Sequence, residues 1–201
     1  TGVQTCALPI WFTRYATEKL KVLESSAPAL EGSARGVLRG AMSDAERRAL
    51  EARALLNLGR YDHALELLEN DRYDAVTIAA VADDEDSLRL LLGLGASAKL
   101  TTSRYDGTAL IAAAHLGHDG VVRQLIAARA PLDHVNNLHW TAVIESIVLG
   151  DGGARHQATL KALIDAGANL QLTDRHGQTP LALARSRGYA AMVALLERAG
   201  A

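Results

Sequence analysis

The side chains best suited to chemistry in this chain are its histidines, and two of them have the spacing of metal ligands. The seven histidines include His115 and His118, three residues apart at the end of an apolar stretch. At that spacing near a helix end, both imidazoles can reach one ion. A metal site at this pair is therefore one hypothesis.

Nucleophilic catalysis and phosphate binding find little support. Ser146 lies near Glu145 and His139 in the sequence, but no nucleophile-elbow pattern or oxyanion glycine loop surrounds it. The glycine-rich stretch 150–153 lacks the Lys-Ser/Thr pair of a phosphate loop and does not follow a strand. We expect this stretch to extend a turn, and we predict no catalytic residues and no enzymatic activity.

These residues lie in a chain of internal repeats. Within 106–126, an apolar run at 110–114 precedes Gly117-His118, and a second apolar stripe follows. This pattern predicts a short helix, a glycine turn and a second short helix. The spacing from threonine to glycine recurs at Thr108 and Gly117, Thr141 and Gly150, and Thr179 and Gly188.

The second stripe recurs as well, and each copy is followed by a turn of small residues. The stripes lie at 88–92, 121–126, 160–164 and 192–196, with turns at 95–96, 129–130, 167–168 and 200–201. The resulting period is about 33 residues, the ankyrin length. Neither helix of such a unit can bury its apolar face alone, so stacking of units is required.

The best-preserved copy is Asp174-Arg-His-Gly177-Gln-Thr179-Pro180-Leu181, followed by Ala184, Gly188-Tyr189, Val193, Leu195-Leu196 and Gly200-Ala201. It closely resembles the ankyrin repeat of bacterial-type proteins. The resemblance covers 73–201 in four units: 73–100, 101–135, 136–171 and 172–201. It implies an all-α ankyrin-repeat solenoid of stacked helix-turn-helix units with short hairpin loops. In this family a histidine after the turn glycine is structural, so for His118 we predict that role, and we predict no metal and no cofactor.

Several residues depart from the family pattern. Asp74 stands where the first unit should have threonine, and Arg129 stands where the second should have glycine. The third unit carries about five extra residues within 150–157, which we place between its two helices. These departures mark where this chain can differ from its relatives.

Glu145 is the sharpest departure, because the equivalent positions hold Ile78, Ala112 and Leu183. An unpaired carboxylate on an apolar helix face is costly, so a partner or access to water is expected. The favoured interpretation is an intramolecular partner, such as a backbone N–H or a neighbouring histidine. The alternative is that Glu145 lies in a groove and receives a basic group from a ligand.

In the ankyrin family, the hairpin tips and the exposed side of the first helices form a concave binding surface. The resemblance therefore implies a partner-binding set rich in residue types that form binding hot spots. An alternative for Trp140 is that it packs across His139, where glycine is missing, and steadies the hairpin. The predicted set is Arg104, Tyr105, His115, Asn137, His139, Trp140, Glu145, Arg175, Gln178 and Arg187.

The composition is that of an ordinary soluble protein, with 201 residues, 49% of them apolar, 22% charged, and a formal net charge of −2. This balance gives no electrostatic case for binding nucleic acid or an anionic membrane. No apolar run approaches the roughly 18 residues of a membrane-spanning helix. We expect a cytoplasmic monomer, with the periplasm left open because the native N-terminus is undefined.

The N-terminal third does not fit the repeat. Residues 1–10, TGVQTCALPI, match the in-frame translation of a common sequencing adapter, so we expect a non-native artefact, which removes Cys6 from consideration. We expect 11–42 to be a linker or untranslated sequence, with Met42 as one possible start. Residues 43–72 predict an N-terminal helical pair, either a degenerate cap or half of a tetratricopeptide unit.

The predicted function is an ankyrin-repeat scaffold that binds a protein of unknown identity through its concave face. Two alternatives belong to other classes. The chain could be a regulatory or docking fragment of a larger enzyme. It could also bind a small ligand or a metal at the third repeat.

Overall fold

The computed structural model describes residues 51–201, apart from 53, 56–58, 61–62, 65–66, 68–72 and 102–104. The chain divides into two compact units, 1–71 and 72–201. In the first unit, the described residues include Leu55 and Leu67, which are helical and fully buried. The predicted non-native segment 1–10, the segment 11–42 and most of the predicted helical pair 43–72 lie outside the described residues.

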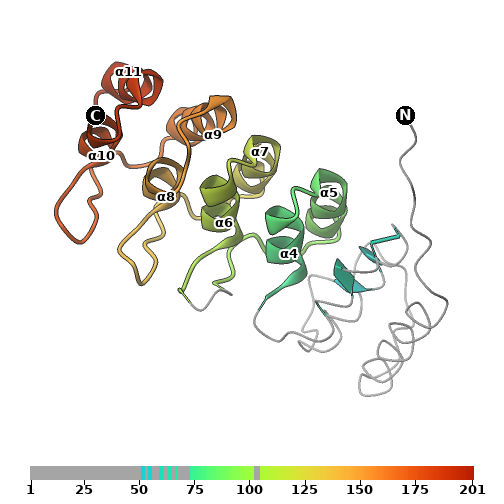
Figure 1. Ribbon diagram of the computed structural model, residues 1–201. Helices are drawn as coiled ribbons and strands as arrows, with labels where there is room; N and C mark the ends of the chain where they lie inside the picture. Colours follow the sequence, from blue (N-terminus) through green and yellow to red (C-terminus); the bar gives the residue numbers. More distant parts are fainter. Residues whose placement is uncertain are drawn as a thin grey trace. The chain divides into compact units, whose positions relative to one another are not determined.

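In the described part of the second unit, eight helices form four helix-turn-helix pairs arranged in a row (Figure 1). This confirms the expected all-α fold of stacked helix pairs. None of the helices in the described range combines the length and apolar character needed to cross a bilayer. The helices are α4 (Ala75–Val81), α5 (Glu85–Gly93), α6 (Ala109–Leu116), α7 (Asp119–Ala127), α8 (Ala142–Val148), α9 (Ala154–Asp165), α10 (Pro180–Ser186) and α11 (Ala190–Arg198).

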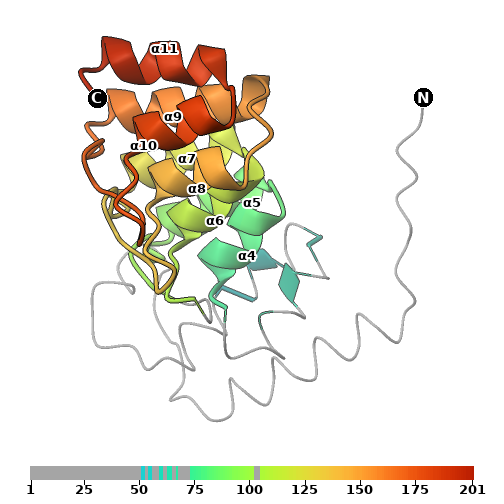
Figure 2. The ribbon, with the colours of Figure 1, turned by 60° about the vertical axis from the view of Figure 1, so that its left-hand side comes forward.

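The helices lie in two rows. We call α4, α6, α8 and α10 the inner row, and α5, α7, α9 and α11 the outer row. Each helix packs on its partner in the pair and on the equivalent helix of the next pair. Successive pairs lie one above another, with the long loops that connect one pair to the next gathered at one side of the stack (Figure 2). Alanines such as Ala79, Ala113 and Ala184 are fully buried and keep the inner row slim, so neighbouring helices approach closely.

Each inner helix starts at a side chain that caps its free N–H groups. The Thr108, Thr141 and Thr179 hydroxyls each accept from the backbone N–H three residues later, at 3.3 Å. Asp74 performs the same task for α4, accepting from the Thr77 N–H at 2.9 Å. The substitution of threonine by aspartate in the first unit is therefore conservative, since both are good N-caps.

The outer helices end in left-handed turns, and one such turn lacks glycine. Gly95, Gly167 and Gly200 have φ of 94, 86 and 82°, and Arg129 adopts 62° at the same position. The N–H of the following residue, Ala130, donates to the Leu125 carbonyl at 3.0 Å, so the turn keeps its hydrogen bond. The left-handed conformation of a non-glycine residue costs about 1–2 kcal/mol.

Residues 150–157, which we call the insert, do not all lie between the two helices, and here the sequence-based placement was wrong. The turn occupies 150–153, whereas the second half of the insert forms the first turn of α9, which is twelve residues long against nine for α7. A helical start satisfies backbone groups internally and brings Arg155 and His156 onto a rigid element. The expectation that 150–153 extends a turn is confirmed.

The insert contacts all three other helix pairs. Arg155 Nη2 lies 2.6 Å from Asp83 Oδ2, in the first pair. The His156 ring lies 3.0 Å from the His115 carbonyl oxygen, in the second. The Tyr189 hydroxyl donates to the Gly150 carbonyl at 2.9 Å, from the fourth. The insert therefore ties together the whole described stack.

Candidate functional site

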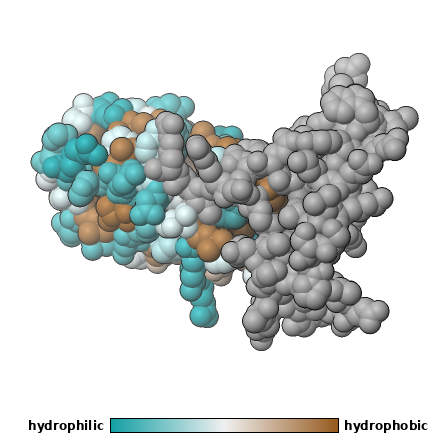
Figure 3. Space-filling model, turned by 90° about the horizontal axis from the view of Figure 1, so that it is seen from below, coloured by the Kyte–Doolittle hydropathy of each residue, from teal (hydrophilic) through white to brown (hydrophobic). Residues whose placement is uncertain are grey.

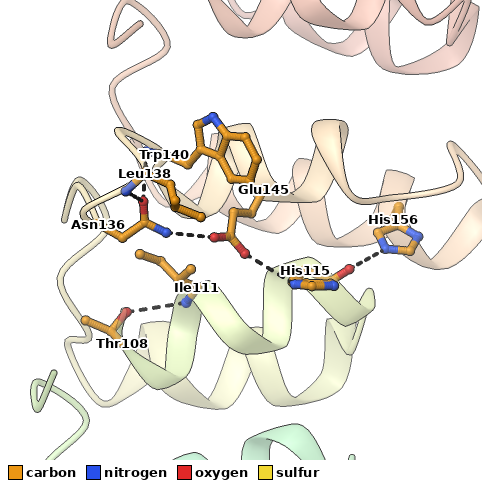
Figure 4. A network of polar contacts seen from close by, with 8 residues as sticks. All are labelled: Thr108, Ile111, His115, Asn136, Leu138, Trp140, Glu145 and His156. Carbon is orange, nitrogen blue, oxygen red and sulfur yellow. Dashed lines mark hydrogen bonds and ion pairs between the residues drawn. The ribbon is translucent and has the colours of Figure 1, made fainter. Parts of the chain in front are cut away.

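The candidate site lies on the inner row, where a carboxylate interrupts an apolar helix face. Glu145 is one turn into α8, which begins at the Thr141 cap. The residue is only 5% exposed, and the matching positions in the neighbouring helices are Ala112 and Leu183. Figure 4 shows the carboxylate pointing between Asn136, in the preceding hairpin, and His115, on α6.

Asn136 holds one oxygen of this carboxylate. Its Oδ1 accepts from the backbone N–H groups of Leu138 and Trp140, both at 3.0 Å. These two donors orient the amide, so Nδ2 faces Glu145 and donates to Oε1 at 2.8 Å. Asn136 therefore stabilises the hairpin turn and is also the first hydrogen-bond partner of the buried Glu145.

Asn136 is not among the residues predicted from the sequence. A signal was present, because Asp174 occupies the same position in the fourth unit and accepts from the His176 and Gln178 N–H groups at 2.8 and 2.9 Å. The third unit differs from the fourth at two matching positions: it has Asn136 in place of Asp174, and Glu145 in place of Leu183. Unlike the ionised carboxylate of an aspartate, the amide of asparagine can both accept from the turn N–H groups and donate to a carboxylate.

His115 is the second partner of Glu145. Its Nδ1 lies 3.5 Å from Oε2, and its side chain is 46% exposed. Burial and the charge of nearby His156 lower the pKa of His115. Glu145 therefore has an intramolecular partner on each oxygen, although the contact with His115 is long for a hydrogen bond.

Burial raises the pKa of Glu145 to about 7, and the hydrogen bond from Asn136 offsets only part of this effect. The cause is the loss of hydration, which disfavours the charged form. Both protonation states are therefore populated near neutral pH. A positive group brought to this carboxylate would favour its ionised form.

His156 fixes the helix end that carries His115. Its Nε2 faces the His115 carbonyl at 3.0 Å, and its Nδ1 faces Asp151 Oδ1 at 2.8 Å. Hydrogen bonds from the Gly153 N–H and from His156 lower the pKa of Asp151. Since both ring nitrogens face acceptors, the ring satisfies both contacts only when it is doubly protonated.

The hairpin residues predicted for binding lie on neighbouring loops. The Asn137 N–H donates to the Tyr105 carbonyl at 2.9 Å, which joins the second and third hairpins. Tyr105, Asn137 and His139 are exposed, and Trp140 is half-buried. The backbone of His139 has φ of 63°, so the missing glycine is replaced by a histidine in the left-handed region.

The remaining predicted residues are more dispersed. Arg175 and Gln178 are exposed on the fourth hairpin. Arg187 is exposed at the end of α10, at the opposite end of that helix from the hairpin, so the structure does not group it with the other residues. Arg104 lies outside the described residues.

Two residues considered for chemistry have structural roles. His118 Nδ1 lies 2.9 Å from the Ala80 carbonyl oxygen and links two helix pairs. Ser146 is fully buried, and its hydroxyl donates to the Val143 carbonyl of its own helix at 2.8 Å. Within the described residues, no group of three or more His, Cys, Asp or Glu side chains is arranged to hold a metal ion.

On the side seen in Figure 3, apolar side chains lie in small groups among polar ones. Large apolar side chains that are exposed in the described stack include Val81 and Tyr105, together with Leu116 and Leu149 at the ends of α6 and α8. Leu116 and Leu149 thus place exposed apolar surface at the C-terminal ends of α6 and α8, which is the end of α8 that follows Glu145 in the chain.

Comparison with protein families gives a match of residues 76–174 to the family described as ankyrin repeats (3 copies). The chain is 38% identical over 125 residues to the putative ankyrin repeat protein YahD of Escherichia coli (strain K12), a segment covering 62% of each protein. It is 33% identical over 127 residues to a putative ankyrin repeat-containing protein of Treponema pallidum (strain Nichols), covering 62% of this chain and 40% of that protein. The chain thus matches less than two thirds of the length of these relatives.

Solved structures show the same arrangement. An ankyrin repeat domain (ABAYE2397) from Acinetobacter baumannii AYE is 35% identical, with a TM-score of 0.68 over 94% of this chain and 96% of that one. The ankyrin repeat protein EF0377 has a TM-score of 0.65 over 93% and 96% of the two chains. At 23% identity, the second likeness supports the fold alone.

Proposed function

Because the chain belongs to the ankyrin repeat family, we propose that it is a scaffold that binds another protein through its hairpins and inner row. Ankyrin repeats are typically protein-interaction modules and usually non-catalytic, and we propose no reaction for this chain. The family supports the class of function but does not identify the partner.

The observation that carries the proposal is the link between the second and third hairpins. The bond from the Asn137 N–H to the Tyr105 carbonyl fixes the spacing between these loops. Tyr105 is 40% exposed, and Trp140 lies on the adjoining hairpin. Aromatic side chains on a rigid support bind with little loss of conformational entropy, which favours them as binding anchors.

The other proposed contacts extend this pair along the array. Asn137 and His139 are exposed on the same hairpin as Trp140, and Arg175 and Gln178 on the next. The side chains of several units then form one row, and a partner that spans it contacts residues far apart in the sequence. Such a surface favours an extended protein segment over a small molecule.

The test compares affinity capture from a lysate of the source organism by the full chain and by Tyr105→Ala/Trp140→Ala. We expect the double variant to lose the proteins that the wild type enriches, at least tenfold by quantitative mass spectrometry. The control is Arg123→Ala/Lys161→Ala, which truncates exposed side chains on the outer row. Circular dichroism must show equal helix content in all three proteins. Equal capture by both variants would refute the proposed surface.

A further inference from the structure

Glu145 is a buried acid whose charge is only weakly compensated by the protein itself. Among the residues that the structure describes, the one basic side chain that contacts it is His115, at a long 3.5 Å, and this imidazole carries a charge only when it is protonated. The Asn136 amide contributes a dipole but no charge. An ionised carboxylate in such surroundings is costly, and a basic group placed against it would lower that cost.

The carboxylate lies directly behind a solvent-facing side chain. His115 is 46% exposed, whereas the Glu145 side chain retains 7% exposure. His115 is the exposed side chain that contacts Oε2, and rotamer changes of exposed side chains are fast. Access of a partner group to the acid would then require a rotamer change of this imidazole.

Apolar surface adjoins the acid on the same side of the helix. Leu149 follows Glu145 by four residues, at the end of α8, so the two side chains share a face. Leu116 occupies the equivalent place on α6 and directly follows His115. Leu116 and Leu149 are 39% and 43% exposed. An acid that shares its helix face with one exposed leucine, beside a helix that ends in another, complements a basic side chain with an apolar neighbour.

We propose that the protein partner places a lysine or arginine side chain against Glu145, with apolar residues beside it covering Leu116 and Leu149. This inference rests on the proposed function, and it adds the chemistry of the partner. The long aliphatic stem of a basic side chain suits the apolar surface, while its charged head reaches the carboxylate. In the complex, the His115 side chain would adopt another rotamer, and the cationic group of the partner would take its place beside Glu145.

The test uses a random dodecapeptide phage library panned against the full wild-type chain. We expect enrichment of peptides with a lysine or arginine next to Leu, Ile, Val or Phe. The best peptide, synthesised, should bind Glu145→Gln at least tenfold more weakly by calorimetry. Replacement of its basic residue by norleucine should cause a similar loss on the wild type but little further loss on Glu145→Gln.

The control Asp165→Asn removes one negative charge from an exposed position on the outer row and should leave the affinity unchanged. If selected peptides lose affinity for Tyr105→Ala/Trp140→Ala but bind equally to Glu145→Gln, the basic-residue proposal is wrong and the proposed function stands. If the selected peptides are insensitive to all of these substitutions, or if none is selected, both proposals fail.

Discussion

Glu145 and Asn136 act as a pair, because the Asn136 amide donates to the buried carboxylate while it also stabilises the hairpin. In the fourth unit the same two positions hold Leu183 and Asp174, a combination that needs no amide. In the third unit the amide of Asn136 serves the hairpin with its oxygen and Glu145 with its nitrogen. The buried acid is therefore supported by one residue that a repeat-by-repeat alignment can identify.

The raised pKa of Glu145 predicts that this residue destabilises the fold at high pH. Its pKa is about 7 in the folded chain against 4.5 for an ordinary glutamate. The folded state thus holds its proton more tightly, and the resulting stability is present below about pH 4.5 and lost as the pH rises through 7. We expect Glu145→Gln to stabilise the chain by about 1–3 kcal/mol at pH 8 and by far less at pH 5.

Urea unfolding followed by circular dichroism at both pH values measures this difference. The depressed pKa of His115 acts in the opposite sense, costing stability as the pH falls below 6.5, but it is present in both proteins. Because His115 contacts Glu145, the difference between the two stabilities reports on the carboxyl group together with this contact. An equal gain in the free energy of unfolding from Glu145→Gln at pH 5 and at pH 8 would show that the pKa of Glu145 is not raised in the folded chain.

Asn136→Asp tests the pairing directly. The variant keeps an acceptor for the turn N–H groups, as Asp174 does, but sets a carboxylate against Glu145. We expect the free energy of unfolding to fall by about 1–3 kcal/mol at pH 8, because the variant loses a hydrogen-bond donor and places two negative carboxylates next to each other. Adding Glu145→Leu, which recreates the arrangement of the fourth unit, should restore the stability. Additive effects of the two substitutions on the free energy of unfolding in this double-mutant cycle would contradict the pairing.

At the scale of the element, the insert is the feature that distinguishes this stack. Its residues contact Asp83, His115 and Tyr189, one from each of the other helix pairs. The exposed Arg155–Asp83 ion pair contributes little by itself, on the order of 0–1 kcal/mol. The close packing around the insert glycines is the tighter constraint, because a Cβ on Gly150 would clash with the Ser146 carbonyl oxygen and lie 2.7 Å from the His156 ring.

Gly152→Ala should reveal how firmly the insert is packed. Gly152 has φ of +70°, and an added Cβ would lie 2.5 Å from the Tyr189 ring. Gly177→Ala is the matched control, since Gly177 has φ of +74° with nothing within 4 Å. Both variants carry the left-handed strain of about 1–2 kcal/mol, and the clash should make the loss at Gly152 larger by about 1–3 kcal/mol.

The background Tyr189→Ala removes the ring from this contact. In that background, Gly152→Ala and Gly177→Ala should cost the same free energy of unfolding, as measured in urea. If the two glycine variants already cost the same in the wild-type background, the insert is not packed tightly against the fourth pair.

At the scale of the whole molecule, the sequence predicts what is local and repeated, and misses what crosses between units. The caps at Thr108, Thr141 and Thr179 follow from spacing alone, because a cap acts on its own helix. The contact of Arg155 with Asp83 spans 72 residues, and no periodicity indicates it. Glu145 was recognised as anomalous and a neighbouring histidine was considered as its partner, but the partner Asn136 became evident only from the hairpin beside α8.

We propose that a protein partner covers the hairpins and the inner row. Hydrogen–deuterium exchange of the chain, alone and with its captured partner, can locate the surface that the partner covers. We predict slower exchange in the complex for 105–116 and 137–149, with no change in the outer helices α7 and α11. Protection confined to the outer row, with the inner row unchanged, would contradict the account.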